Sequence, residues 1–306
     1  PQPRVTPSAA ASSPATFRRF SFFPMHGWAK LWLHGAGPRR ATASVAHHCE
    51  TYPMNNLHNP IEGVPQLWKT RYGIMNSVPG KCPASRSLGH YGEWIEQELD
   101  LLSEIVSDHQ YVLEIGSEFG AHALWFARAV GDRGQVHVIE PRRMVMQQLC
   151  ANVALNGLSN VHTHPLWLGR MEGMSELGTL LPGLESISER RERVPVRALD
   201  DLNLDALHLL KINYPGEAGS VLEGAAATVR KHRPALYFRM GDQDAAEDEI
   251  RRVKDLGYRC WSHLPYLYSR SNQVGNALNI FPGRVYQNVI ATPQEGGVAF
   301  ERLIEL

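Results

Sequence analysis

One segment, from Tyr111 to Glu140, restricts the folds open to this chain more than any other. It consists of a β-rich run (111–115), a glycine-containing break, a helical stretch (121–130) and a second apolar run that ends at Glu140. This order is typical of a βαβ unit, in which a helix joins two parallel strands and a ligand binds at their carboxyl edge. We therefore expect a parallel sheet with a nucleotide-like ligand site after the first strand.

The break after the first strand has the pattern Glu114-x-Gly116-x-x-x-Gly120, which differs from the G-x-G-x-x-G of dinucleotide-binding folds. Gly116 lets the backbone turn and approach a ligand closely, and Gly120 opens a helix whose free N–H groups face that ligand. Carboxylates at Glu114 and Glu118 would repel a pyrophosphate and suit a cation. Glu140, about 20 residues beyond the loop, can accept hydrogen bonds from two ribose hydroxyls.

S-adenosylmethionine matches these features, because it carries a sulfonium, an ammonium group and a ribose but no phosphate. The segment resembles the first motif of class I methyltransferases, and a Gly-rich turn in an unrelated α/β protein is the alternative. Trp167 follows the third expected strand, and its side chain is expected either to stack on the adenine or to pack in the core. The predicted cofactor-binding residues are Glu114, Gly116, Ser117, Gly120, Glu140, Pro141 and Trp167.

Composition limits the classes of partner and compartment. The chain has 306 residues with 31 acidic and 31 basic side chains. It therefore has no net positive charge, and its composition predicts no nucleic-acid partner. Its four cysteines form no C-x-x-C pair and no metal-ligand spacing, which predicts free thiols, a cytoplasmic location and no metal site. No apolar run reaches the length of about 18 residues that a membrane span needs.

The N-terminal residues 1–54 differ from the rest of the chain. Residues 1–49 contain no Asp or Glu, six Lys or Arg, and many Ser, Ala and Pro. We expect a low-complexity basic extension that is disordered, or sequence translated upstream of a start at Met25. An organelle transit peptide and a membrane-touching arm are the alternatives.

The remainder divides into a lead-in with a cap helix (55–110), a domain with the methyltransferase-like motif (111–295) and a short tail (296–306). Residues 55–81 are expected to be irregular, and Tyr91–Val106 to form one helix that caps the sheet near the ligand edge. Residues 169–193 are expected to be a loop. Further helices are predicted over 142–156, 220–232 and 245–256, and further strands over 161–164, 208–212, 235–239, 258–261 and 289–291. This alternation predicts an α/β fold with a mostly parallel sheet covered on both faces.

Several sequence blocks match those of FkbM-type methyltransferases, in the same order, over roughly Ser87–Pro293. They include GHYGEWIEQELDLL, LEIGSEFGAHALWFA, VHVIEPRRMVMQQLCANVALNGLSNV and NIFPGRVYQNVIATP. The chain resembles this family most distinctively in Glu140-Pro141 followed by Leu149, Asn152 and Asn156-Gly157. The resemblance implies a class I methyltransferase Rossmann-like fold with a seven-stranded sheet. It also implies O-methylation, commonly of sugars or of glycan- and polyketide-derived hydroxyls.

The chain departs from the family pattern after the fourth strand. Where the family has K-I-D-x-E-G-x-E, this sequence has KINYPGEA, so that Asn213, Pro215 and Ala218 replace acids. Arg239 replaces a further family acid, and Glu217 is the only acid left in the loop. Methyl transfer to a hydroxyl needs alignment and removal of a proton, and an asparagine can orient the hydroxyl but cannot accept its proton.

The candidate catalytic residues are therefore Glu217, Asn213 and Glu93, with His122 and Asp242 as further candidate bases. The leading hypothesis is an S-adenosylmethionine-dependent O-methyltransferase acting on a sugar, glycan or other small hydroxyl acceptor. The alternative is a non-catalytic S-adenosylmethionine- or glycan-binding module on the same fold. A nucleotide-dependent oxidoreductase is disfavoured by the missing third glycine. The sequence leaves the oligomeric state and a requirement for a divalent metal open.

Overall fold

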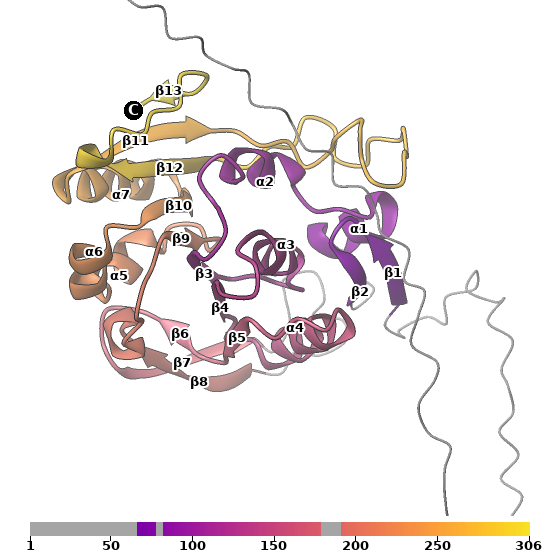
Figure 1. Cartoon of the computed structure of the whole chain (residues 1–306), viewed down its shortest axis with the longest axis horizontal. Coiled ribbons are helices and arrows are strands. Elements are labelled where there is room, and N and C mark those ends of the chain that lie inside the picture. The colour runs from indigo at the N-terminus through magenta and orange to yellow at the C-terminus, as the bar shows by residue number, and fades with distance from the viewer. Residues whose placement is uncertain (1–65, 78–81, 179–190) are drawn as a thin grey trace, which may run out of the picture. The chain divides into compact units, whose positions relative to one another are not determined.

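The computed structural model describes residues 66–77, 82–178 and 191–306, all within the unit Asn55–Leu306. The predictions for residues 1–54 lie outside these ranges. A sheet of eight strands forms the centre of the domain, in the order β13-β11-β12-β10-β9-β3-β4-β5 (Figure 1). Its strands are β3 (Tyr111–Ile115), β4 (Gln135–Ile139), β5 (Val161–His164), β9 (Leu209–Ile212), β10 (Ala235–Arg239), β11 (Tyr258–His263), β12 (Asn288–Pro293) and β13 (Ile304–Glu305).

The direction of the strands confirms the prediction of a mostly parallel sheet. β5, β4, β3, β9 and β10 run parallel, whereas β12 is antiparallel to both β10 and β11. The two-residue β13 adds to the edge of the seven-stranded arrangement. The chain passes from β3 outward to β4 and β5, and then returns to the other side of β3 as β9 and β10. This reversal makes the carboxyl edge of β3 and β9 the topological switch point, where open α/β sheets bind ligands.

Helices cover both faces of the sheet. In Figure 1, α2 (Glu96–Leu102), α3 (Ala121–Ala129) and α4 (Arg143–Leu155) lie on one side, and α5 (Ala218–Glu223), α6 (Ala226–His232) and α7 (Gln243–Asp255) on the other. Two groups of buried apolar side chains correspond to these sides, one containing Leu124 and Leu149, the other containing Val221, Val229 and Val253. Each face of the sheet therefore has its own hydrophobic core.

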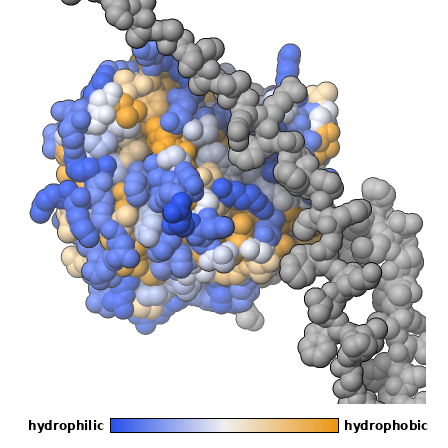
Figure 2. Space-filling view, viewed as in Figure 1, coloured by the Kyte–Doolittle hydropathy of each residue, from blue (hydrophilic) through white to orange (hydrophobic). Residues whose placement is uncertain are grey.

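The face of the domain that Figure 2 shows is largely polar. Hydrophobic residues occur on it in small groups. Among the helices in the described ranges, none has the length and apolar character needed to cross a membrane.

The N-terminal part of the domain differs from the predicted irregular lead-in and single helix over 91–106. Residues 66–77 form a hairpin of β1 (Gln66–Thr70) and β2 (Gly73–Ser77), and a helix that was not predicted, α1 (Pro83–Tyr91), precedes α2. Gly92 ends α1 in the left-handed region, with φ of 66°, and its N–H donates to the carbonyl of Leu88. A glycine in this position stops a helix, so the predicted single helix is interrupted before α2.

Two other expectations need correction. The predicted loop over 169–193 contributes strands to a separate sheet of β6 (Trp167–Leu168), β7 (Gly173–Gly178) and β8 (Arg191–Arg197), in the order β6-β8-β7. Charged residues at the start of β8 (Arg191, Glu192 and Arg193) concealed this pairing, because strand propensity depends strongly on the partner strand. The predicted helix over 220–232 is divided into α5 and α6. Two short 3-10 helices, η1 (Leu199–Leu202) and η2 (Gln294–Gly296), complete the described elements.

Two asparagines of α4 attach the β1–β2 hairpin to the domain. Asn152 is fully buried; its Nδ2 donates to the carbonyls of Asn76 (3.0 Å) and Phe119 (2.8 Å), and its Oδ1 accepts from the Asn76 N–H (2.6 Å). One turn later, Asn156 forms the same pair of bonds with the backbone of Ile74, at 3.2 and 2.7 Å. These side-chain amides form hydrogen bonds with main-chain N–H and C=O groups of β2, as the backbone of a neighbouring strand would.

We expect Asn152→Leu to lower the free energy of unfolding by about 2–3 kcal/mol, because it leaves buried backbone groups without partners. Urea unfolding measures the change, with Gln147→Leu on the exposed face of the same helix as the control. Equal stability of the two variants would contradict the role of Asn152.

Candidate functional site

A group of buried charged side chains lies at the switch point of the sheet. Lys211 of β9 is 1% exposed, and its Nζ lies 3.0 Å from Glu98 Oε2 of α2 and 3.1 Å from Glu114 Oε1 of β3. The ring of His122, in the first turn of α3, lies 3.7 Å from Glu98 and 3.8 Å from Glu114. Its Nε2 is 2.7 Å from the carbonyl oxygen of Trp94. A buried charge is costly unless it is paired, and here one ammonium group serves two carboxylates.

This charge arrangement keeps both carboxylates ionised. Burial is the largest single influence and raises the pKa of each, but Lys211 outweighs it, together with Arg239 near Glu98 and the hydrogen bond from Ser117 to Glu114. The pKa of Glu98 is lowered to about 2, and the pKa of Glu114 is also lowered. Burial lowers the pKa of His122, which favours the neutral imidazole. The cation beside Glu114 is thus supplied by the protein itself.

A small cavity adjoins this charged group and is lined by Trp94, Glu98, Glu114, Gly116, Ser117, Glu118, His122, Lys211, Asn213 and Arg239. The Glu118 Oε2 is buried and has no hydrogen-bond partner among the described residues, and the same is true of Arg239 Nε. The Arg239 guanidinium lies 3.7 Å from the centre of the Tyr286 ring and 3.5 Å from Glu98. Burial raises the pKa of Glu118 to about 7. One unpaired acceptor and one unpaired donor therefore belong to the same cavity wall.

The glycine loop takes a backbone conformation that suits close approach of a ligand. Gly116 and Gly120 have φ values of 75° and 85°, in the left-handed region that side chains with a Cβ disfavour. Ser117 Oγ donates to Glu114 Oε2 at 2.7 Å, and Gly120 begins α3. The loop is therefore held against the end of β3, at the position that the sequence predicts.

Glu140, at the end of β4, is fully buried and already hydrogen-bonded. Arg142 donates from Nε to Oε1 (2.8 Å) and from Nη2 to Oε2 (3.1 Å), and its backbone N–H also donates to Oε1 (3.0 Å). The Tyr214 hydroxyl lies 3.3 Å from each carboxylate oxygen and accepts from Arg142 Nη2 at 2.7 Å. Pro141, which is buried, connects the two charged residues. A ribose would have to replace these partners.

The Tyr214 ring covers the glycine loop. A Cβ placed on Gly116 would lie 3.0 Å from Tyr214 Cζ. The ring stacks on Trp167, with centroids 4.7 Å apart and planes at 29°. Tyr214 thus contacts three of the predicted cofactor-binding residues, Gly116, Glu140 and Trp167, and brings them together through its own side chain.

Asn213 is bonded into the charged group. Its Nδ2 donates to Glu114 Oε1 (3.0 Å) and to the carbonyl of Gly116 (3.1 Å), and its Oδ1 accepts from Lys211. An aspartate here would add a carboxylate beside Glu98 and Glu114, whereas the amide donates to one of them. Asn213, which replaces the family acid, therefore connects the end of β9 to the glycine loop by hydrogen bonds.

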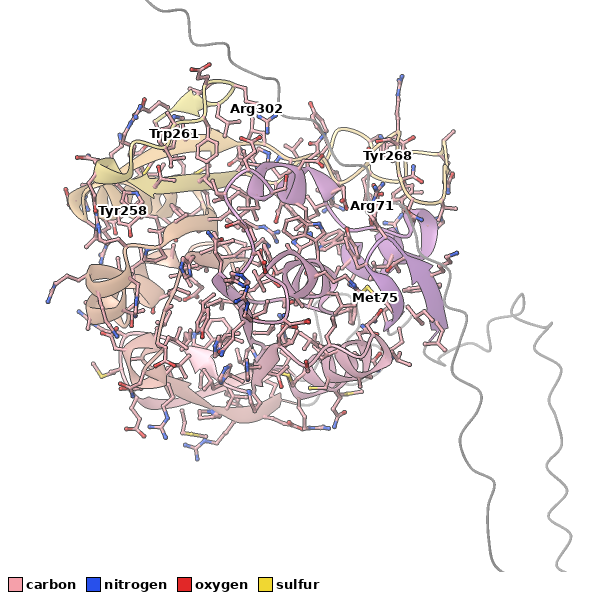
Figure 3. The ribbon with its side chains drawn as sticks, in the orientation of Figure 1. Arg71, Met75, Tyr258, Trp261, Tyr268 and Arg302 are labelled. Carbon is pink, nitrogen blue, oxygen red and sulfur yellow. The ribbon has the colours of Figure 1, made fainter. Side chains whose placement is uncertain are left out.

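The other two predicted catalytic residues are not among those that line the cavity. Glu217 precedes α5 and is partly exposed, and burial raises its pKa. Glu93 is buried; its Oε2 accepts from Arg71 Nη2 (2.7 Å) and from the Gln273 N–H (2.8 Å). Glu93 thus joins the hairpin turn to the long loop before β12, and Figure 3 shows Arg71 near the part of that loop that carries Tyr268.

The candidate base Asp242 is also used elsewhere, as the N-cap of α7, where it accepts from the Ala245 N–H at 3.0 Å. Within the described ranges, no three His, Cys, Asp or Glu side chains are placed to hold a metal ion.

Sequence reasoning missed four residues of the site: Glu98, Lys211, Arg142 and Tyr214. Lys211 did carry a signal, because a lysine inside the apolar run Leu-Leu-Lys-Ile of a buried strand requires a buried partner. Tyr214 carried none, since its contacts depend on the path of the chain after β9.

The seven-stranded order with its reversed strand β12, and a site at the switch point, define a class I methyltransferase fold. Residues 114–260 match the Methyltransferase FkbM domain. These residues therefore form a domain of the FkbM methyltransferase family.

Several solved structures are similar to the chain. Methyltransferase FkbM from Methylobacillus flagellatus KT is 18% identical over 60% of this chain and 44% of its own, with a TM-score of 0.43. An S-adenosylmethionine-dependent O-methyltransferase from Thermotoga maritima is 13% identical over 76% and 78%, with a TM-score of 0.42. Fibrillarin from Aeropyrum pernix, with natively bound S-adenosyl-L-methionine, is 13% identical over 64% and 74%, with a TM-score of 0.39. The match spans less than half the length of the first of these, and no curated protein matches the chain.

Proposed function

We propose that the chain is an S-adenosylmethionine-dependent methyltransferase that acts on a hydroxyl group of a sugar, a glycan or another small acceptor. The proposal rests chiefly on one observation: the glycine loop and Glu140 end the adjacent strands β3 and β4 at the switch point, inside an FkbM domain. S-adenosylmethionine, when bound, supplies a methyl group activated by a sulfonium.

The residues at this edge fit the parts of the cofactor once the Tyr214 side chain has moved. Glu140 would accept hydrogen bonds from the ribose hydroxyls, as the sequence predicts. Gly116 has no Cβ and leaves space for close approach, and Trp167 offers an aromatic face to the adenine. The other predicted residues would shape the site: the side chains of Ser117 and Glu114 hold the loop through their hydrogen bond, Gly120 starts α3 and Pro141 follows Glu140.

The cavity beside the loop offers a way to remove the proton from an acceptor hydroxyl. Glu118 Oε2 can accept that proton, and Arg239 Nε can donate a hydrogen bond to the hydroxyl oxygen of the acceptor. Both protein atoms are available because they lack partners among the described residues. With a pKa raised to about 7, the Glu118 carboxyl suits general-base work near neutral pH. We therefore assign the proton acceptor to Glu118 in place of Glu217, Asn213 and Glu93.

A non-catalytic binding module on the same fold is the second candidate. The observation that favours it is Asn213, which cannot accept a proton and whose amide is already bonded to Glu114, Gly116 and Lys211. Transfer of a labelled methyl group to a panel of sugars, glycans and small phenols, with and without magnesium, separates the two. Labelled product supports the enzyme, and cofactor binding without product supports the module.

We expect Glu140→Ala to weaken the binding of S-adenosylhomocysteine at least about 10-fold, since one hydrogen bond to a charged group contributes about 1.5–3 kcal/mol. Isothermal titration calorimetry measures the affinity. Because Arg142 loses its partner, thermal melting must show that the variant is folded. Glu172→Ala, which removes an exposed carboxylate paired with Arg197, is the control. Unchanged affinity in folded Glu140→Ala would refute the assignment of the ribose site.

A further inference from the structure

We propose that Tyr214 and Arg142 close the cofactor site of this chain, so that S-adenosylmethionine binds only after the Tyr214 side chain has been displaced. The inference rests on the proposed function, because it concerns the same site. It adds a conformational step before cofactor binding, and neither the family nor the fold implies that step.

The Tyr214 side chain makes contacts that the nucleoside part of a cofactor would need. Its hydroxyl occupies the two oxygens of Glu140 at 3.3 Å, where ribose hydroxyls would bind. Its ring stacks on Trp167 in place of an adenine, and it lies over Gly116 so closely that a Cβ there would be 3.0 Å away. Tyr214 and a nucleoside therefore compete for the same three residues.

Arg142 makes this closed arrangement favourable. Glu140 is fully buried, and a buried carboxylate without partners would be costly. Arg142 neutralises it through two side-chain bonds, holds the Tyr214 hydroxyl at 2.7 Å, and lies 5.1 Å from the centre of the Tyr214 ring. Burial alone would lower the pKa of Arg142, yet Glu140 beside it raises that pKa well above its usual range. Burial also raises the pKa of Tyr214, so its hydroxyl keeps its proton.

The segment that carries Tyr214 lies outside the sheet. It is the turn between β9 and α5, in which Pro215 and Gly216 are exposed and Gly216 has φ of 78°. Opening exchanges the Tyr214 contacts for contacts with the ligand. The apparent affinity is then the intrinsic affinity reduced by the fraction of molecules that are open.

The test is calorimetry of S-adenosylhomocysteine binding to the full chain and to Tyr214→Ala and Tyr214→Phe. If the closed form exceeds the open form by about ten to one, Tyr214→Ala binds about 10-fold more tightly than wild type. Tyr214→Phe keeps the ring but loses the hydroxyl bonds to Glu140 and Arg142, so it shows a smaller gain. Melting temperatures establish that both variants are folded.

A neighbouring pair of arginines gives a matched control. Arg142→Ala removes the residue that holds Tyr214 against Glu140, and it tightens binding. Arg143→Ala removes an exposed arginine that pairs only with Glu192 in the described contacts, and it leaves the affinity unchanged. Fluorine NMR of 5-fluorotryptophan-labelled protein, with the Trp167 signal identified by Trp167→Phe, follows the stack directly. Tyr214→Ala shifts that signal without ligand, and S-adenosylhomocysteine shifts it in wild type.

The outcomes separate this proposal from the proposed function. Tighter binding in Tyr214→Ala together with weaker binding in Glu140→Ala supports both. Equal or weaker binding in folded Tyr214→Ala, with measurable binding in wild type, overturns the closed site and leaves the methyltransferase proposal standing. Binding by none of the proteins overturns the proposed function and the closed cofactor site with it.

Discussion

Lys211→Met is expected to lower the free energy of unfolding by about 3–5 kcal/mol, because it leaves two buried carboxylates without their cation. Glu98 and Glu114 are 0% and 1% exposed, and both lie within 3.1 Å of the Lys211 ammonium. Methionine has a similar length and apolar stem, so the loss arises from the missing charge rather than from a cavity. The two carboxylates would have to take up protons to remain buried.

Urea unfolding at pH 7 measures this loss, with Lys231→Met on the exposed face of α6 as the control. The triple variant with Glu98→Gln and Glu114→Gln should recover part of the stability, because it removes the uncompensated charges as well as the cation. A Lys211→Met protein as stable as the control would show that the buried group does not depend on this ammonium.

Glu98 is expected to make the protein sensitive to acid. Its pKa is lowered from 4.5 to about 2 in the folded protein, so its contribution to stability is fully present above pH 4.5 and is lost as the pH falls toward 2. The size of this contribution is about 3–4 kcal/mol, because one pKa unit corresponds to about 1.4 kcal/mol. The folded state must then bury a protonated carboxyl group beside Lys211, which loses one of its two carboxylate partners.

The measurement compares wild type with Glu98→Gln in urea at pH 7 and at pH 3. Glu98→Gln should be much less stable than wild type at pH 7, and the difference should shrink at pH 3. The comparison with the variant is needed because Glu96 and Glu118, whose pKa values burial raises to about 7, change stability in the opposite direction between pH 4.5 and 7. A difference that does not change with pH would contradict the assignment.

The central part of the fold could be predicted from local sequence. The runs at Tyr111–Ile115 and Ala235–Arg239 give strands with the predicted bounds, because apolar β-rich runs between breaks have few alternatives in an α/β chain. The hairpin of β1 and β2 was missed, since β2 is held by Asn152 and Asn156 of a helix far along the chain. The sheet of β6, β7 and β8 was missed for a similar reason, because its short or charged strands are recognisable only by their pairing.

For the site, the sequence placed the glycine loop and Glu140 correctly at the ends of adjacent strands. Of the candidate residues for proton removal, His122 and Asn213 line the cavity, whereas Glu93 and Glu217 do not, and Glu118 lines it without having been a candidate. Whether a carboxylate in a loop can act as a base depends on which groups lie near it, and the path of the folded backbone decides that. Glu93 illustrates this, because its partner Arg71 lies in the hairpin that the sequence did not reveal.

The sequence by itself determined the parallel sheet, the turn at Gly116 and the acid at the end of β4, because strand propensity, freedom at φ and position after a strand are local properties. Only the tertiary structure decided which charges and rings meet. Lys211 is 97 residues from Glu114 along the chain, and Tyr214 is 74 residues from Glu140. These contacts form because neighbouring strands end at one edge of the sheet, where buried charges must find partners. No local pattern records which partner each one finds.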